Sequence, residues 1–287
     1  MAKSQGARLD RSKLLADPIL VATIVVLIAF LTLFILYPLA ILMVDSVVGE
    51  HGPTLDVFAR VLAMPTFDTA ITNTLSLGLF VGVALIGLLF AYVEEYVQLK
   101  SRLMSGLFKL VSLLPVVSPP FVLSLSVIML FGKAGIITRH MLGIYDNNVY
   151  GFWGIALVQT MTFFPVCYMM FKGLLKNIDP SLEEAARDMG ASRWKVFTSV
   201  TLPLVLPGIG NAFLVTFIES IADFANPMLI GGSFDTLATS IYLQITGAYD
   251  KQGAAAMAVV LLLITLAMFV VQKYVLEARA TATLTGK

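Results

Sequence analysis

Six long apolar runs dominate this chain and restrict what it can fold into. They cover roughly residues 18–44, 70–93, 107–131, 150–172, 204–230 and 253–276. A helix needs about 20 apolar residues to cross a hydrocarbon core of about 30 Å. Because the core holds no water to pair with free backbone groups, each run is expected to be helical. The sequence therefore predicts an all-α membrane protein with six transmembrane helices.

Composition excludes several classes of function. Of the 287 residues, 58% are apolar and 13% are charged, and the net charge is +1 with no basic stripe, so nothing indicates nucleic-acid binding. Two histidines and one cysteine argue against a dedicated zinc site. There is no P-loop and no positioned nucleophile. We therefore expect no catalytic residue, no metal site and no cofactor within this chain, and no hydrolysis of nucleotide by it.

Lysine and arginine are distributed unevenly between the loops. Fifteen of them precede the first run, follow the last run, or flank the second and fourth connections, whereas the opposite side holds only Arg60, Lys133, Arg139 and Lys251. The positive-inside rule then places both termini and the 173–203 loop in the cytoplasm. We accordingly expect a cytoplasmic segment at 1–17, the six-helix membrane domain at 18–276, and a cytoplasmic tail or connector at 277–287.

Small residues and prolines mark special positions inside the runs. The second run places Ser76, Gly78, Gly82 and Gly87 on one side, which favours close helix packing. Prolines interrupt two other runs, and each is expected to kink its helix. These prolines are Pro115, Pro119, Pro120 and Pro165.

The 173–203 loop has the signals of two short helices. Asp179 is a suitable N-cap, Pro180 a suitable first helical residue and Gly190 a suitable stop. A second helix is expected to begin at Ser192 and to end by Pro203, which opens the fifth run. A compact pair of helices is therefore predicted beside the membrane.

The first of these helices carries an apolar face. Leu182, Ala185, Ala186 and Met189 recur at the spacing of one helix side. Such a face either sits in the groove of a partner protein or lies on the lipid surface. The residues alone leave both interpretations open.

The order of residues in this loop resembles a known pattern. Glu184-Ala185-Ala186, three residues, Gly190, nine residues and Val200-x-Leu202-Pro203 are similar to the EAA loop of binding-protein-dependent ABC importer permeases. Val200 replaces the isoleucine of that pattern and is the one departure. The resemblance covers nearly the whole chain through the six-run layout, and it implies the type I ABC importer permease fold.

In that family the loop is the coupling helix that docks into a cleft on an ATPase subunit. The resemblance thus implies two ATPase subunits, which hold ATP and Mg, a second permease half and a periplasmic or lipid-anchored substrate-binding protein. We assign ATPase coupling to Glu184, Ala185, Ala186, Gly190, Trp194, Leu202 and Pro203.

Polar residues at membrane depth are candidates for a translocation pathway, because their burial is costly. Glu219 and Asp223 are four residues apart and are expected to share a helix face. They either attract a cation or cap a broken helix. The full candidate set is Asn73, Ser118, Gln159, Glu219, Ser220, Asp223 and Asn226.

The segment from Glu219 to Pro227, followed by Gly231-Gly232, resembles permeases for ferric iron. Related permeases carry polyamines, thiamine or phosphonates, so the resemblance implies ferric iron or another small ion or polar solute. Ferric-iron permeases often join two such halves in one chain, and the segment from Thr281 to Lys287 resembles their connector. Homodimer, heterodimer and fused half all remain open. The alternative function is an ion-coupled secondary transporter that uses Glu219 and Asp223.

Overall fold

A computed structural model describes residues 17–49, 52–83, 86–96, 102–119 and 121–276. The expected N-terminal segment up to residue 16 and the expected tail at 277–287 lie outside these residues. Among the described residues, six helical segments are long and apolar enough to cross a membrane, which confirms the predicted all-α architecture. They are Pro18–Val47, Pro65–Glu94, Val122–Met141, Phe152–Lys176, Arg193–Ala222 and Lys251–Tyr274.

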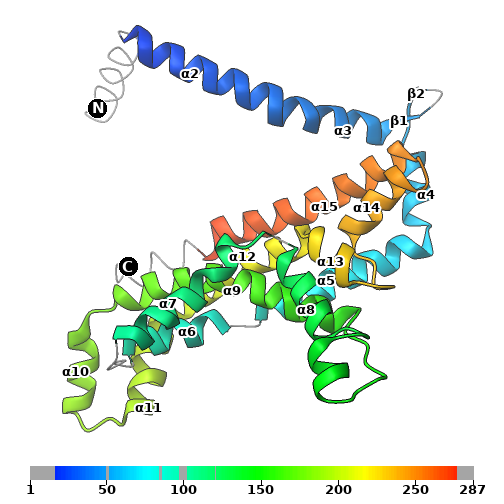
Figure 1. The fold of residues 1–287 in the computed structure, drawn as a ribbon. Coiled ribbons are helices and arrows are strands. Elements are labelled where there is room, and N and C mark those ends of the chain that lie inside the picture. The colour runs from blue at the N-terminus through cyan, green and yellow to red at the C-terminus, as the bar shows by residue number, and fades with distance from the viewer. Residues whose placement is uncertain (1–16, 50–51, 84–85, 97–101, 120, 277–287) are drawn as a thin grey trace.

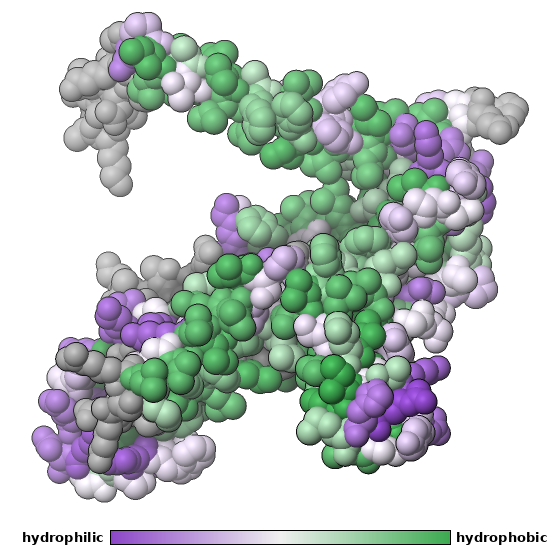
Figure 2. Space-filling model, in the orientation of Figure 1, coloured by the Kyte–Doolittle hydropathy of each residue, from purple (hydrophilic) through white to green (hydrophobic). Residues whose placement is uncertain are grey.

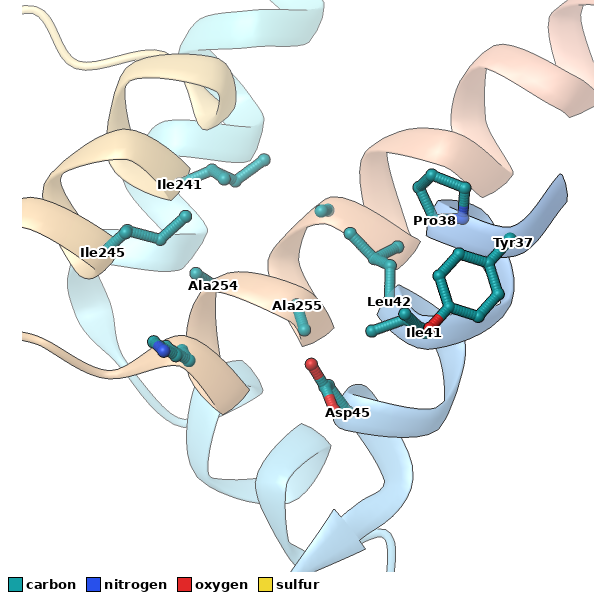
Figure 3. A pocket seen from close by; sticks show the side chains of 11 residues that line it. Tyr37, Pro38, Ile41, Leu42, Asp45, Ile241, Ile245, Ala254 and Ala255 are labelled. Atoms are coloured by element: carbon teal, nitrogen blue, oxygen red, sulfur yellow. The ribbon is translucent and has the colours of Figure 1, made fainter. Parts of the chain in front are cut away.

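The first span forms an arm that extends away from the other helices (Figure 1). None of its apolar core is buried, and its contact with the body is made by its last part, where α3 packs on α15. Figure 3 shows the open apolar groove of about 420 Å³ at this junction, with Asp45 at its edge. The arm and the short segments after it are α2 (Pro18–Leu31), η1 (Thr32–Leu36), α3 (Tyr37–Val47), β1 (Val48–Gly49), β2 (Gly52–Pro53) and α4 (Asp56–Leu62). Strands β1 and β2 pair antiparallel.

The second span packs closely on its neighbours, as its small residues predicted. It consists of α5 (Pro65–Val83) and α6 (Ile86–Tyr96), which pack against α12 and α9 respectively. A Cβ on Gly78 would lie 2.6 Å from Ile221 Cγ2, and one on Gly87 would lie 2.5 Å from Cys167 Cβ. Glycine at these positions therefore allows the helix axes to approach.

The third span is not the single helix predicted for 107–131. Helix α7 (Arg102–Val117) ends before Pro119, and α8 (Val122–Phe131) begins after it; a π-helical turn, η2 (Ile136–Met141), follows. Pro119 has no backbone N–H to donate, and a residue before a proline is disfavoured in helical conformation. The membrane-length segment is consequently Val122–Met141.

The fourth span, α9 (Phe152–Lys176), is the centre of the bundle. Ile155, Ala156, Val158 and Phe171 are completely buried on it. Pro165 lies inside this helix without ending it. Helix α9 contacts α5, α6, α7, α8, α12 and α13, so it connects almost every other part of the body.

The fifth span differs from its prediction at both ends. The chain stays helical from Arg193 to Ala222, so the prediction that the second loop helix ends by Pro203 is wrong. The π-helical turn before Pro203 accommodates this proline. At the other end, the helix stops at Ala222 instead of continuing to residue 230. The elements are α10 (Pro180–Asp188), α11 (Arg193–Val196), η3 (Phe197–Thr201), α12 (Leu202–Ala222) and α13 (Ala225–Ile230).

Helices α14 (Leu237–Thr246) and α15 (Lys251–Val271) and the turn η4 (Gln272–Leu276) complete the described chain. The start of α2, the end of α15 and the α10–α11 pair lie toward one end of the molecule, and β1, β2 and α4 lie at the other (Figure 1). Figure 2 shows hydrophilic residues gathered over α10 and α11 and at the opposite end, with hydrophobic surface between them. This distribution matches a protein that crosses a membrane along its long direction.

Candidate functional site

Helix α10 begins where the sequence predicted. Asp179 is its N-cap and accepts a hydrogen bond on Oδ1 from the N–H of Ser181 at 3.0 Å, and Pro180 is the first helical residue. This hydrogen bond holds the pKa of Asp179 below its ordinary value. The start of α10 is thus fixed by local interactions.

Gly190 forms the turn between α10 and α11. Its φ of +85° lies in the left-handed region, which glycine enters without strain. The N–H of Gly190 binds the carbonyl of Arg187, and the N–H of Ala191 binds that of Ala186. The predicted role of Gly190 as a turn is confirmed.

The apolar face of α10 is divided between the bundle and the surface. Ala186 is buried, whereas Leu182, Ala185 and Met189 are exposed; the exposed fraction of Met189 is 83%. We call Leu182, Ala185 and Met189 the docking face. These three side chains form the exposed part of the apolar face of α10.

The other residues assigned to coupling lie in different environments. Glu184 and Trp194 are exposed, and the indole of Trp194 packs on Phe197 with ring centroids 5.6 Å apart. Pro203 is also exposed, but Leu202 packs against the core around Tyr168 and Val205. The structure therefore places Leu202 as a packing residue and leaves Glu184 and Trp194 accessible.

Glu183 is a residue whose role sequence reasoning missed. It stands next to the exposed Glu184, and a glutamate on a short polar helix is ordinarily exposed as well. Instead it is 8% exposed and accepts hydrogen bonds from Tyr96 Oη at 2.6 Å and Thr201 Oγ1 at 2.8 Å. A cleft of about 610 Å³ opens beside these groups, between α6, α10 and α11. The signal for its burial in the sequence is its helical position, because Glu183 directly follows Leu182 and so points away from the docking face.

A second charged group, also missed, lies between α6, α7 and α9. Glu94 accepts hydrogen bonds from Tyr168 Oη and from Lys172 Nζ, the latter at 2.8 Å. Lys109 Nζ lies 3.9 Å from the same carboxylate. Only 12% of the Glu94 side chain is exposed. Its ion pair with Lys172 joins α6 to α9, two helices that are far apart in sequence.

Four of the candidate pathway residues come together at the break between α12 and α13. Gln159 Nε2 donates to Asp223 Oδ2 at 2.9 Å, and Ser220 Oγ donates to Gln159 Oε1 at 2.6 Å. Asn226 Nδ2 also donates to Asp223 Oδ2, at 2.8 Å, and Ser124 Oγ of α8 donates to Asn226 Oδ1 at 2.7 Å. This polar network ties α8, α9, α12 and α13 together.

The expectation that Glu219 and Asp223 share a helix face is wrong. Helix α12 ends at Ala222, and Asp223 has an extended backbone with φ −69° and ψ 121°. Asp223 Oδ1 accepts hydrogen bonds from the N–H groups of Ala225 and Asn226, the first two residues of α13. Glu219 is exposed on α12. The two acids therefore sit in unlike environments and form no pair in the described structure.

Asn73 and Ser118 lie outside this network. Asn73 Nδ2 donates to the carbonyl of Asp235 at 2.9 Å, and so holds α5 to the loop before α14. Ser118 Oγ donates to the carbonyl of Leu114 at 3.2 Å. Within the described part of the chain, no cluster of three His, Cys, Asp or Glu side chains is arranged to hold a metal ion.

Residues 83–280 match the model of one protein family, described as binding-protein-dependent transport system inner membrane component. The chain is 35% identical over 278 residues to a putative ferric transport system permease protein, FbpB 1, of Haemophilus influenzae, covering 94% of this chain and 44% of that protein. It is 34% identical to the ferric transport system permease protein FbpB of Actinobacillus pleuropneumoniae, covering 40% of it. The chain thus spans less than half the length of these relatives.

Solved structures show the same fold. A chain of a bacterial ABC transporter involved in the import of the acidic polysaccharide alginate superposes with a TM-score of 0.77 at 18% identity, covering 94% of this chain and 99% of that one. A chain of the MetNI methionine ABC transporter superposes with a TM-score of 0.57 at 21% identity, covering 73% and 94% respectively. The match of the family model over most of the chain shows that this chain belongs to the family of binding-protein-dependent transport system inner membrane components.

Proposed function

We propose that this chain forms one membrane half of an ATP-driven importer and receives the motion of an ATPase subunit through α10. The observation that carries the proposal is the open docking face of Leu182, Ala185 and Met189 on a short, well-capped helix. Small and apolar side chains let a partner approach closely. The EAA pattern of the same helix and the family membership of the chain support the same role.

The partners follow from this role. Two ATPase subunits bind ATP and Mg, and a second permease half, identical, related or fused to this one, completes the pathway. This chain contributes no catalytic residue and no cofactor of its own. Closure of the ATPase pair moves α10, and the two halves then open alternately to the two sides of the membrane around a central passage.

The proposed cargo is ferric iron, delivered by a periplasmic or lipid-anchored binding protein. The names of the two ferric transport relatives support this substrate, as does the sequence from Glu219 to Pro227. Asp223 and Asn226 occupy the break in the fifth span. They are proposed as pathway residues that shape the break.

We further propose that the chain lies in a bacterial inner membrane with both termini and α10 in the cytoplasm. The start of α2, the end of α15 and the α10–α11 pair lie toward the same end of the molecule (Figure 1). The excess of lysine and arginine on that side supports the orientation.

The alternative of an ion-coupled secondary transporter depends on Glu219 and Asp223 as a relay. Asp223 accepts hydrogen bonds from Gln159, Ala225 and Asn226, and Glu219 is exposed on another element. This arrangement favours the ATP-driven importer, because a relay needs carboxylates that exchange a proton or ion with each other.

Co-purification tests the proposal. The chain is expressed in membranes with a candidate ATPase subunit of the importer, and retention of the ATPase is measured for wild type and for Met189→Glu. Met141→Glu is the matched control, because Met141 is 73% exposed but lies in η2, far from α10 in Figure 1. We expect Met189→Glu to lose at least about tenfold in retention, as for an interface hot spot, and the control to equal wild type. Equal retention by Met189→Glu would contradict the proposed docking.

A further inference from the structure

A buried carboxylate in the first turn of α10, that of Glu183, links this helix to two other parts of the bundle. Glu183 Oε1 accepts one hydrogen bond from Tyr96 on α6 and another from Thr201 at the end of η3. Glu183 Oε2 lies 3.6 Å from Arg187 Nη2, one turn along α10. Three elements therefore meet at one side chain.

The surroundings of this carboxylate make the link stiff. Glu183 is 8% exposed and Thr201 is 2% exposed, so the loss of a hydrogen bond to this carboxylate is expected to be costly. Tyr96 stacks on Tyr92 with ring centroids 4.7 Å apart, and Tyr92 packs edge-on against Phe197 of η3 at 5.2 Å. Burial and the contact with Glu183 raise the pKa of Tyr96 above its ordinary value, which keeps its hydroxyl protonated as a donor.

The two partners of Glu183 stand at the start of long paths through the bundle. Thr201 directly precedes α12, whose far end is the break that Asp223 caps. Tyr96 ends α6, which packs on α9 through the close approach of Gly87 to Cys167. A displacement of α10 would therefore reach both α12 and α6, provided that the carboxylate keeps its two hydrogen bonds.

We propose that Glu183 is a positioning residue that transmits the displacement of α10 to α12 and α6. The inference rests on the proposed docking of α10 on an ATPase and adds a residue that is buried away from that interface. Glu183 holds the helix rather than touching the ATPase. Removing the link is expected to leave docking intact while α10 moves without the bundle.

The test separates docking from transmission. Tyr96→Phe and Thr201→Val each remove one hydroxyl with little change of shape, and the double variant removes both hydrogen bonds to Oε1. The matched control is Thr198→Val, since Thr198 also lies in η3 but its hydroxyl binds the backbone carbonyls of Trp194 and Lys195. For each variant we measure ATPase retention on purification, the KM for ATP, and the cargo transported per ATP hydrolysed in proteoliposomes with loaded binding protein.

The double variant is expected to keep wild-type retention and KM while cargo transported per ATP falls about tenfold, the effect of losing one or two hydrogen bonds to a charged group. Glu183→Gln retains an acceptor oxygen, so its cargo transported per ATP is expected to lie between the values of wild type and the double variant. Thr198→Val is expected to equal wild type. Unchanged transport per ATP in the double variant would overturn the inference. So would parallel loss of retention and transport, because Glu183 would then only maintain the shape of the docking helix. A wild-type chain that retains no ATPase would instead overturn the proposed function itself.

Discussion

Gln159 of α9 donates a hydrogen bond to Asp223 at 2.9 Å and thereby holds the point where the fifth span breaks. Gln159 is completely buried, and its amide oxygen Oε1 accepts a hydrogen bond from Ser220 of the fifth span. A buried amide with all its partners fixes the relative position of two helices more sharply than apolar contact does. The break is therefore a defined part of the fold.

Asp223→Asn is expected to lower the free energy of unfolding by about 2 kcal/mol, because its new NH₂ group faces the amide donors of Gln159 and Asn226. Glu219→Gln, on the exposed side of α12, is expected to leave stability unchanged. Thermal unfolding in detergent measures both. A variant at 223 with wild-type stability and reduced transport of cationic cargo alone would indicate direct contact with the substrate instead.

Gly87→Ala is expected to destabilise the bundle by about 1–3 kcal/mol, the usual cost of overpacking. The added Cβ would lie 2.5 Å from Cys167 Cβ and 2.6 Å from the backbone N of Tyr168. Gly106→Ala on α7 is the control, because nothing lies within 4 Å of its Cβ; helix propensity there favours alanine by about 0.5–1 kcal/mol. If Gly87→Ala unfolds at the wild-type temperature, α6 and α9 are not packed as described.

Gly190→Val is expected to disturb the α10–α11 turn and to reduce ATPase retention while leaving membrane insertion intact. Space is not the cause, since nothing lies within 4 Å of the added Cβ; the cause is the φ of +85°, which costs an L-residue about 1–2 kcal/mol. Gly190→Asn is the matched control, because asparagine tolerates this conformation better. Equal loss with valine and asparagine would indicate a steric clash in the interface and not backbone strain.

Lys172→Met and Lys109→Met compare two lysines that face the same carboxylate. Lys172 Nζ lies 2.8 Å from Glu94 Oε1 and Lys109 Nζ lies 3.9 Å from it. Losing the shorter, hydrogen-bonded pair is expected to cost about 1–3 kcal/mol, whereas the more exposed Lys109 is expected to contribute less than about 0.5 kcal/mol. Chemical unfolding of the purified variants measures the difference, and equal effects would show that the ion pair with Lys172 is not the stronger one.

The parts of the structure that the sequence predicted well depend on interactions between residues that are close in sequence, or on the lack of a side chain. Asp179, Pro180 and Gly190 act through their own backbone neighbours, so their roles at the ends of α10 follow from residue type and order. The close packing at Gly78 and Gly87 follows from the lack of a side chain. Such features need no knowledge of which helices meet.

The features that the sequence did not predict depend on contacts between distant segments. Glu183 and Glu184 are adjacent and chemically identical, but Glu183 alone is buried, where it meets Tyr96, 87 residues away, and Thr201. The break after Ala222 contains no proline at that point, and Asp223 is held there by Gln159, 64 residues away. The sequence therefore predicted one continuous helix for the fifth run.

The proposed importer depends on the docking of an ATPase subunit on the docking face of α10. The most direct measurement is ATPase activity of the purified complex in lipid nanodiscs, with and without iron-loaded binding protein, for wild type and for Ala185→Arg. Ala185 is exposed in the middle of the docking face, so arginine there should leave the bundle folded, as checked by its unfolding temperature, and block close approach. Loaded binding protein is expected to stimulate the wild type, and this stimulation is expected to be lost in Ala185→Arg. Wild-type stimulation in a folded Ala185→Arg variant would contradict docking of the ATPase on this face.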